Sequence, residues 1–471
     1  MFSHDVSLPV WVLLLLLITT TLLLLDRIFI PGLKWILRRR VNRVIQEINV
    51  KLDIEIRPFQ LTRRTALIDQ LLFDEKVSQH IIEYAKEKQM PREVAQSIAR
   101  RYASEIVPSF NAYMYFRVGY WFAKRIARMI YRVRVGFFDN NAMSKISSHD
   151  TVIFVMNHRS NMDYILTSFL VAEKTALSYA VGEWAKIWPL QTLIKTMGAF
   201  FVRRNSGNAL YRKVLERYVH MATTAGVCQA VFLEGGLSKD GELREARLGF
   251  LDYILRGFHS ENERDIVFVP VGINYDRVIE DRSLLRKLDK NSEKRSLWFV
   301  LKTSIGFAFK NILLSRRNRL HRFGYASVNF GKPVSTRQFT QSKQIEFRKL
   351  SRDERFEYVN LLATSLMENI RDVIPILPVA VMSSVILDNQ GEWKNHLVLL
   401  SDAIKKIEKM QTQGAPINIS TIAYETVLTR AIIMLKARKI LEERDGLLRA
   451  YVHSTNILAY YANSIKHWTS Q

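Results

Sequence analysis

The chain is poor in cysteine, in repeated sequence and in residues spaced as metal ligands. Its single cysteine, Cys228, excludes a disulfide within the chain and leaves no cysteine cluster for a structural zinc ion. No group of histidine, aspartate and glutamate has the spacing of a metal site, so we expect no metal. Internal repeats are absent, and low-complexity sequence is confined to one leucine-rich run.

Acidic residues are also few relative to basic ones. The chain has 69 lysines and arginines against 45 aspartates and glutamates, which gives a formal net charge of +24. Such an excess indicates anionic partners, such as phospholipid headgroups, nucleic acid or phosphorylated substrates. The basic residues are scattered beside leucine and aromatic runs, without a recognisable nucleic-acid-binding module. We therefore expect no nucleic acid partner.

One apolar run is long enough to cross a membrane. Residues 8–25, LPVWVLLLLLITTTLLLL, carry no charge and would extend about 27 Å as a helix, close to the roughly 30 Å of a hydrocarbon core. The leader lacks the basic residues of a signal peptide, and the run ends at Asp26 and Arg27, so we expect a retained span. Basic residues between 34 and 43 follow it. The positive-inside rule then places the N-terminus outside and the rest of the chain in the cytoplasm.

Residues 32–140 are predicted to be basic, mostly helical and close to the membrane. Within them, residues 110–138 read FNAYMYFRVGYWFAKRIARMIYRVRVGFF and interleave aromatic rings with arginine and lysine. Aromatic rings beside cations that extend toward water suit a helix lying at the headgroup boundary. A core helix with a solvated basic face fits the pattern equally well.

Residues 141–350 alternate apolar runs with helical stretches, the pattern of an α/β layer. The predicted strands are residues 151–156, 199–202, 227–233, 266–271 and 326–330. Residues 281–322 are dense in lysine and arginine but contain apolar runs, which indicates an insertion that contacts membrane or an acidic partner. A solvated basic surface is the alternative. Residues 351–471 return to a helical pattern.

The first predicted strand ends in a candidate acid–base pair. In TVIFVMNHRSNMD, residues 151–163, His158 and Asp163 follow the strand. Substrate crevices in open α/β sheets lie outside the carboxyl ends of strands. On one continuous helix the two side chains would point about 140° apart, so the spacing predicts His158 on a loop and Asp163 in the next helix. There the carboxylate can orient an imidazole that removes a proton. A chance pair is the alternative.

Three further predicted strands end in residues suited to binding an anion. GAFFVRR at 198–204 ends in two arginines, which can clamp phosphate, although paired arginines are more often solvated. FLEGGLSKDG at 232–241 opens a glycine-rich turn, whose backbone N–H groups can approach a ligand. PVGINY at 270–275 places Pro270 beside a glycine at the predicted strand end.

In this order and at these distances, HRSNMD, GAFFVRR, FLEGGLSKDG and PVGINYDRV resemble the four motif blocks of glycerolipid acyltransferases. GAFFVRR and EGG most resemble the membrane-bound bacterial glycerol-3-phosphate acyltransferases, as do NFGKP at 329–333 and YYANSIKH at 460–467. The likeness extends over roughly residues 90–471. It implies an α/β acyltransferase domain at 141–350, with a mixed sheet flanked by helices. A transmembrane helix at 1–31 and helical regions at 32–140 and 351–471 complete the expected organisation, that of a single-pass protein of the inner membrane.

The resemblance implies acyl transfer from acyl-CoA or acyl carrier protein to the sn-1 hydroxyl of glycerol 3-phosphate, which forms lysophosphatidate. His158 would be the general base and Asp163 would orient it. The residues implied in substrate binding are Arg203, Arg204, Glu234, Gly235, Gly236, Lys239 and Pro270, with Arg203 favoured for direct phosphate contact. No cofactor and no acyl-enzyme are implied, so Cys228 should be a small buried residue. A nucleophilic Cys-His-Asp route is the rival.

One residue departs from the family pattern. Leu237 follows EGG where the family usually has an arginine, whose contact with a phosphate would contribute about 1.5–3 kcal/mol. Lys239 lies close enough in sequence to substitute, and Arg247 falls where the family often has a lysine before a glycine, here Gly249. The departure keeps dihydroxyacetone phosphate and lysophosphatidate open as acceptors. A membrane-anchored scaffold without activity is a further alternative, although His158 and Asp163 are both intact. The oligomeric state has no signature in the sequence.

Overall fold

The computed structural model describes residue 20 and residues 55–138, 140–172, 175–182, 190–203, 206–261, 264–286, 288, 323–389, 391–419 and 424–469. The predicted span at 8–25 lies outside these ranges apart from Thr20, and so do residues 289–322 of the basic insertion. Among the helices described, none has both the length and the apolar character needed to cross a membrane. Met1–Leu52 and Asp53–Gln471 are separate units, and the elements below belong to the second.

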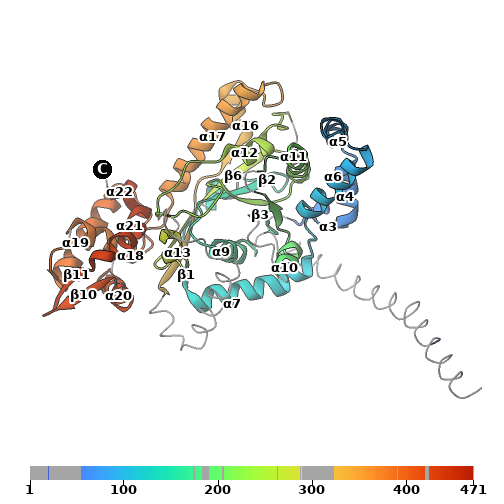
Figure 1. Cartoon of the computed structure of the whole chain (residues 1–471). Helices are drawn as coiled ribbons and strands as arrows, with labels where there is room; N and C mark the ends of the chain where they lie inside the picture. Colours follow the sequence, from blue (N-terminus) through green and yellow to red (C-terminus); the bar gives the residue numbers. More distant parts are fainter. Residues whose placement is uncertain are drawn as a thin grey trace, which may run out of the picture. The chain divides into compact units, whose positions relative to one another are not determined.

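A mixed sheet organises this second unit (Figure 1). Its described strands are β1 Arg132–Phe138, β2 Thr151–Met156, β3 Ser178–Gly182, β4 Phe200–Val202, β5 Gln229–Phe232, β6 Ile266–Tyr275, β7 Tyr325–Phe330 and β8 Val334–Ser335. They are ordered β1-β7-β6-β2-β5-β3-β4, and β8 also pairs with β6. From β6 to β4 all neighbours are parallel, whereas β7 and β8 run antiparallel to β6. The predicted mixed α/β sheet is therefore confirmed.

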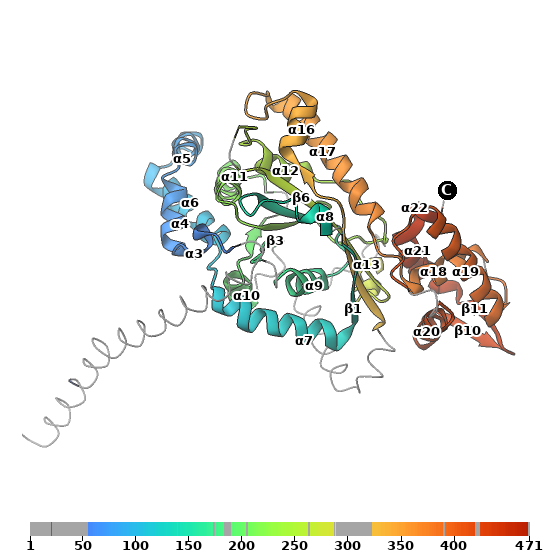
Figure 2. The ribbon, with the colours of Figure 1, turned by 180° about the vertical axis from the view of Figure 1, so that it is seen from behind.

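Alternate residues of β2 enter two different apolar clusters, one on each face of the sheet. Val152, Phe154 and Met156 belong to the first cluster, and Ile153 and Val155 to the second. The helices of the two faces are α7 Tyr120–Ile130 and α9 Met162–Val171 on the first, and α11 Ala209–Thr224, α12 Leu248–Leu255 and α17 Arg352–Asp372 on the second (Figures 1 and 2). A strand covered on both faces is a continuous apolar run, as TVIFVM is.

The second cluster also includes residues of the helices that precede the sheet. These helices are α4 Arg64–Leu72, α5 Glu75–Glu87 and α6 Arg92–Ile106, and Phe59 of α3 Pro58–Leu61 packs against the same cluster. The π-helix η2 Met114–Gly119 follows α6. Asp74 caps α5 by accepting hydrogen bonds from the N–H groups of Lys76 and Val77, which would otherwise have no partner in the helix. The remaining short helices within the α/β part are α8 Asn140–Met143, α10 Leu190–Thr196, α13 Asp281–Arg286 and α16 Thr336–Lys343.

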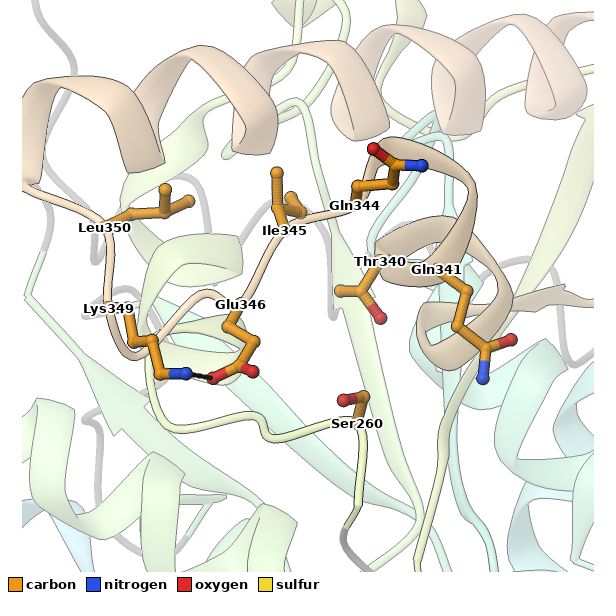
Figure 3. A pocket seen from close by; sticks show the side chains of 8 residues that line it. All are labelled: Ser260, Thr340, Gln341, Gln344, Ile345, Glu346, Lys349 and Leu350. Carbon is orange, nitrogen blue, oxygen red and sulfur yellow. Dashed lines mark ion pairs between the residues drawn. The ribbon is translucent and has the colours of Figure 1, made fainter.

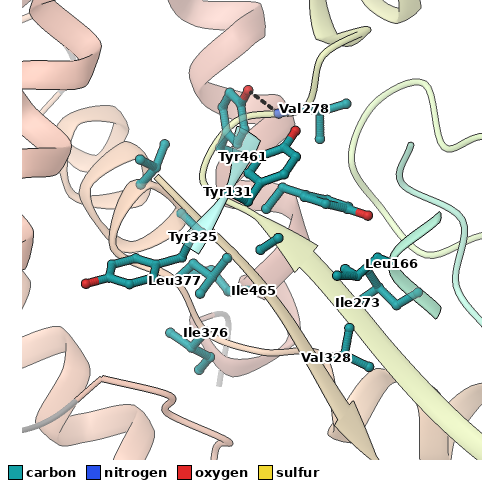
Figure 4. Close-up of a cluster of buried hydrophobic side chains, with 14 of the residues drawn as sticks. Tyr131, Leu166, Ile273, Val278, Tyr325, Val328, Ile376, Leu377, Tyr461 and Ile465 are labelled. Atoms are coloured by element: carbon teal, nitrogen blue, oxygen red, sulfur yellow. Dashed lines mark hydrogen bonds between the residues drawn. The ribbon is translucent and has the colours of Figure 1, made fainter. Parts of the chain in front are cut away.

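The C-terminal region shares the first cluster with the sheet. Its elements are α18 Pro378–Asp388, β9 Lys394–Asn395, α19 His396–Thr412, α20 Tyr424–Ala437, β10 Leu441–Arg444, β11 Leu447–Ala450, η5 Val452–Ser454, α21 Thr455–Ala462, η6 Asn463–Ile465 and α22 Lys466–Thr469. Figure 4 shows Ile376, Leu377 and Ile465 gathered with Tyr325 and Val328 of β7. The helical pattern predicted for this region is confirmed, with a small antiparallel sheet of β9, β10 and β11 added.

Two sequence-based predictions are wrong in detail. Residues 132–138, predicted as the end of a helix, form β1, because they pair with β7, a partner far along the chain that a local pattern cannot reveal. β6 extends to Tyr275, beyond its predicted end at residue 271, and Pro270 lies inside it. Proline has no N–H to donate to a neighbouring strand. Pro270 lies where the partner of β6 changes, from β8 at Val267 and Phe268 to β7 from Val271 onward.

Candidate active site

Three of the four sequence motifs meet at one edge of the sheet. Met156 of β2 pairs with Phe232 of β5 on one side and with Val271 of β6 on the other. Because these strands are parallel, their carboxyl ends lie at the same edge. The residues that follow β2 and β5 and the end of β6 are therefore neighbours, which is where an open α/β sheet binds its ligands.

His158 and Asp163 form a hydrogen-bonded pair at this edge. His158 Nδ1 lies 2.9 Å from Asp163 Oδ2. His158 is on the loop after β2 and Asp163 is in the first turn of α9, as their spacing predicts. Both side chains are buried, with 2% and 0% exposed. A carboxylate only accepts, so Nδ1 carries the proton and Nε2 keeps a lone pair for a substrate hydroxyl.

The carboxylate of Asp163 is held from all sides. Its Oδ2 also accepts from the backbone N–H groups of Arg159, at 2.7 Å, and Ser160, at 3.0 Å. Its Oδ1 accepts from the phenol of Tyr275 at 2.6 Å. Burial raises the pKa of Tyr275 well above its ordinary value, so the phenol remains a donor. The sequence analysis missed Tyr275, although the residue closes the PVGINY motif.

Glu234 positions the backbone of His158. Its Oε1 accepts from the His158 N–H at 2.7 Å, and its Oε2 accepts from the Arg244 N–H at 3.1 Å. The Ser238 N–H in turn donates to the His158 carbonyl at 2.9 Å. Burial raises the pKa of Glu234 to about 7, against the opposing effect of these two hydrogen bonds. The turn after β5 therefore fixes both backbone groups of His158.

The rest of this turn lies close to cations. Gly235 has a φ of +66°, and a Cβ there would lie 2.6 Å from Cδ of Arg247, so the turn requires glycine and Arg247 lies over it. Gly236 and Lys239 belong to the same turn and are half-buried. Leu237 packs against the first apolar cluster, where the family's arginine would bring a charge.

Arg203 lies farther away, at the end of the edge strand β4. Its Nε and Nη2 donate to the two carboxylate oxygens of Glu105 at 2.8 and 2.6 Å, and this pairing raises the pKa of Arg203. Its guanidinium lies 5.1 Å from the ring centres of both Tyr102 and Tyr211. Two strands separate β4 from β2, a lateral offset of about 14 Å. The described contacts do not join Arg203 to His158, and Arg204 lies outside the described residues.

Arg159 is a buried cation that the sequence analysis did not single out. It is 2% exposed, and its Nη1 donates to the Gly241 carbonyl at 2.6 Å. The guanidinium lies 4.6 Å from the ring centre of Tyr460, in the C-terminal region. Within the described part of the chain, its Nε and Nη2 have no hydrogen-bond partner. Buried donors without partners are unfavourable, so this guanidinium is suited to a ligand anion.

Two further side chains fix the loop that carries His158. The Asn157 amide donates to the Ile273 carbonyl at 2.9 Å and accepts from the Ile273 N–H at 2.8 Å, which fastens the end of β2 to β6. Glu280 accepts from the Ser160 hydroxyl at 2.7 Å and from the Asn161 amide at 3.1 Å. Burial raises the pKa of Glu280. These contacts leave the loop little freedom around His158.

Cys228 and the pocket in Figure 3 are separate from this site. Cys228 is 2% exposed, and burial raises its pKa to about 12, so it lacks the thiolate that a nucleophile needs.

The pocket, of about 430 Å³, is lined by Ser260, Thr340, Gln341, Gln344, Ile345, Glu346, Lys349 and Leu350. It lies near the amino end of β6, at the opposite edge of the sheet from His158.

Known proteins match nearly the whole chain. A family model described as acyltransferase matches residues 139–274, and one described as glycerol-3-phosphate acyltransferase C-terminal region matches residues 309–470. A glycerol-3-phosphate acyltransferase of Pseudomonas paraeruginosa is 29% identical over 446 residues, which are 91% of this chain. Together these matches support the glycerol-3-phosphate acyltransferase family for this chain.

The matched relatives are longer than this chain. The chain spans about half of the relatives it matches, 51% of the Pseudomonas paraeruginosa protein and 49% of a Pseudomonas fluorescens glycerol-3-phosphate acyltransferase that is also 29% identical. The crystal structure of the 1-acyl-sn-glycerophosphate acyltransferase PlsC from Thermotoga maritima is similar as well. Its TM-score is 0.30 at 16% identity, over 54% of this chain and 79% of that one.

Proposed function

We propose that this chain transfers an acyl group from an acyl thioester to the sn-1 hydroxyl of glycerol 3-phosphate, forming lysophosphatidate. The observation that carries the proposal is the pair of His158 and Asp163, 2.9 Å apart at the carboxyl end of β2. The names of the relatives over 91% of the chain support the same acceptor. The alternatives, dihydroxyacetone phosphate and lysophosphatidate, would use the same chemistry.

In this mechanism Nε2 of His158 removes the proton from the acceptor hydroxyl as its oxygen attacks the thioester carbonyl. A C–O bond forms, the C–S bond breaks, and the imidazolium returns the proton to the leaving thiolate. Asp163 stabilises the imidazolium and holds the ring, and its four hydrogen-bond donors keep it in place. General base catalysis of this kind contributes about 10² to 10⁴-fold. The reaction as proposed requires no cofactor.

For the acceptor phosphate we propose a set of cations and backbone donors around the strand ends. The set consists of Arg203, Arg204, Lys239 and the turn Glu234, Gly235 and Gly236, with Pro270 shaping the thioester side. The pair with Glu105 uses Nε and Nη2 of Arg203 and leaves the donors of Nη1 for a phosphate oxygen. Arg159 joins this set, since its Nε and Nη2 have no partner among the described residues.

The donor and the location are part of the same proposal. Acyl-CoA and acyl carrier protein are both acidic, and the basic insertion at 281–322 suits either. With the apolar run at 8–25 as a single span, the acyltransferase part would face the cytoplasm at the inner membrane, in contact with membrane phospholipid.

The full chain, assayed with one fixed donor against several acceptors, tests the proposal. With palmitoyl-CoA we expect labelled glycerol 3-phosphate to be acylated faster than dihydroxyacetone phosphate or lysophosphatidate. The variant His158→Ala should form no labelled product. A preference for another acceptor would replace the substrate but keep the mechanism. A lack of transfer from every thioester would support the scaffold instead.

A further inference from the structure

Large apolar side chains are exposed along one face of η2 and α7. Val118, Trp121 and Phe122 are 39%, 56% and 53% exposed, and Tyr113, just before η2, is 45% exposed. Positions 118, 121, 122 and 125 recur at the spacing that places side chains on one side of a helix. Grouped apolar side chains of this kind on a surface mark an interaction site. We call these residues the outer face of α7.

The opposite face is fixed to the rest of the fold. Ala123 and Ala127 are buried, and their small side chains let α7 pack closely on α9 (Figure 1). A Cβ at Gly119 would lie 2.2 Å from Sδ of Met197, so the Met197 side chain packs directly on η2 at this glycine. Tyr115 is buried and accepts from the Leu177 N–H at 3.0 Å. With its inner face anchored, the helix presents the outer face as a permanent surface.

Cations border the exposed rings. Arg117, Arg125 and Arg128 are exposed, and the Arg125 guanidinium lies 5.6 Å from the ring centre of Trp121. Residues 110–138 contain no aspartate or glutamate in the sequence. Without carboxylates, this surface cannot form ion pairs with a basic protein, and its arginines repel such a protein. Aromatic rings at the acyl boundary with arginines among the headgroups are the arrangement of a helix that lies in a membrane interface.

We propose that the outer face of α7 binds the surface of an anionic phospholipid bilayer. From Met114 to Ile130, η2 and α7 would extend about 25 Å along the surface, with Trp121 and Phe122 inserted and the arginines at the phosphates. This contact is distinct from the apolar run at 8–25, because it belongs to the unit that carries the active site.

The contact has a consequence that rests on the proposed function. α7 packs on α9, whose first turn carries Asp163, so the bilayer would lie against the helix layer behind the catalytic pair. An enzyme whose product is an amphipathic lysophospholipid would then release it at the bilayer surface. The charged acceptor would enter the site from water, and the amphipathic product would leave it into the bilayer.

A nitroxide label at position 122 tests the contact. Cys228 is the only cysteine and is buried, so Phe122→Cys in the full chain with Cys228→Ala can be labelled selectively. In vesicles of phosphatidylglycerol and phosphatidylethanolamine, we expect the label to lose collisions with a water-soluble nickel complex and to gain collisions with oxygen. The matched control is Phe73→Cys, an aromatic position 77% exposed at the end of α4, whose label should remain in water.

Further variants decide the nature of the partner. Val118→Cys provides a second label on the outer face if Phe122→Cys does not fold, and we expect the same loss of nickel collisions. Replacing Arg117, Arg125 and Arg128 together by glutamine should return the label at 122 to water. Labels that remain aqueous in both positions, equal depth in purely zwitterionic vesicles, or protection only by added acyl carrier protein would each overturn the proposal. None of these readouts requires acyl transfer, so a failed transferase assay leaves the test intact.

Discussion

The phenol of Tyr275 donates a 2.6 Å hydrogen bond to Asp163, although the two residues lie on different elements, the end of β6 and the start of α9. The Tyr275 ring lies 5.2 Å from the ring centre of Tyr131, which supports it from behind. The orientation of His158 therefore depends on the continuation of β6 past Pro270. We treat His158, Asp163 and Tyr275 as one hydrogen-bonded chain.

Tyr275→Phe should lower kcat by about tenfold or more and leave the KM of the acceptor unchanged. The substitution removes a hydrogen bond to a charged group, worth about 1.5–3 kcal/mol, from the residue that orients the base. The matched control is Tyr131→Phe, which removes a phenol that donates to the Arg277 carbonyl at 2.8 Å. Steady-state kinetics decides, and equal kcat in Tyr275→Phe and wild type would mean that Asp163 needs no third partner.

His158→Ala should reduce kcat by about 10² to 10⁴-fold without unfolding the chain, because it removes the base. The His158 ring stacks on Phe232 at 3.9 Å, so His158→Gln is a second variant that fills more of the space. His220→Gln, a histidine on α11 outside the site, is the control. Circular dichroism should be unchanged in all three. Turnover retained in both His158 variants would remove the assignment of the base.

Arg203→Ala should raise the KM for the phosphorylated acceptor by about tenfold or more, since a charge-assisted contact contributes about 1.5–3 kcal/mol. Arg217→Ala is the matched control. Arg217 forms a similar two-point pair with Asp74, at 2.9 and 2.7 Å, away from the strand ends. Both variants should lose some thermal stability, and only the first should change the KM. An unchanged KM in both variants would mean that Arg203 pairs with Glu105 and does not bind the acceptor.

Arg159→Gln should raise the KM for the acceptor with little loss of thermal stability. Among the described residues, the Arg159 side chain has one hydrogen bond to lose, from Nη1 to the Gly241 carbonyl. Arg438→Gln provides the contrast, because Arg438 is a buried arginine paired with Asp281 and Tyr461. Its loss should lower the melting temperature, since it leaves a buried carboxylate unpaired. Equal loss of stability in the two variants, with the KM unchanged, would contradict a ligand-binding role for Arg159.

Asp276 should make folding stability fall as the pH rises. It is buried between β6 and α18, where it accepts from the N–H groups of Tyr325 at 2.8 Å and Val379 at 3.1 Å, and burial raises its pKa from 3.8 to about 6. The folded state then binds a proton at Asp276 more tightly than the unfolded state does. The stabilisation that results from this proton is fully present below about pH 4 and is lost as the pH rises through about 6. The stability of wild type minus that of Asp276→Asn should decrease over this window in urea unfolding. An increase of this difference over the same window would contradict a raised pKa of Asp276 in the folded state.

The sequence predicts the local parts of this site well and the long-range parts poorly. His158 and Asp163 share one strand–loop–helix unit, so their spacing alone predicts their arrangement. Tyr275 reaches Asp163, and Glu105 reaches Arg203, only because the sheet brings distant segments together. No local pattern marks such pairs. The sequence did not predict β1 for the same reason. Its arginines and aromatic residues fit a helical pattern, and the strand forms because it pairs with β7, which is far along the chain.

The C-terminal residues close the turn that holds His158. Asn463 donates to the Asp240 carbonyl at 2.9 Å, and Ser464 accepts from Asn274 at 3.1 Å, while Tyr460 covers Arg159. During translation these residues leave the ribosome long after the strands they contact. We therefore expect ribosome-bound chains stalled before residue 455 to lack these contacts and, under the proposed function, to be inactive.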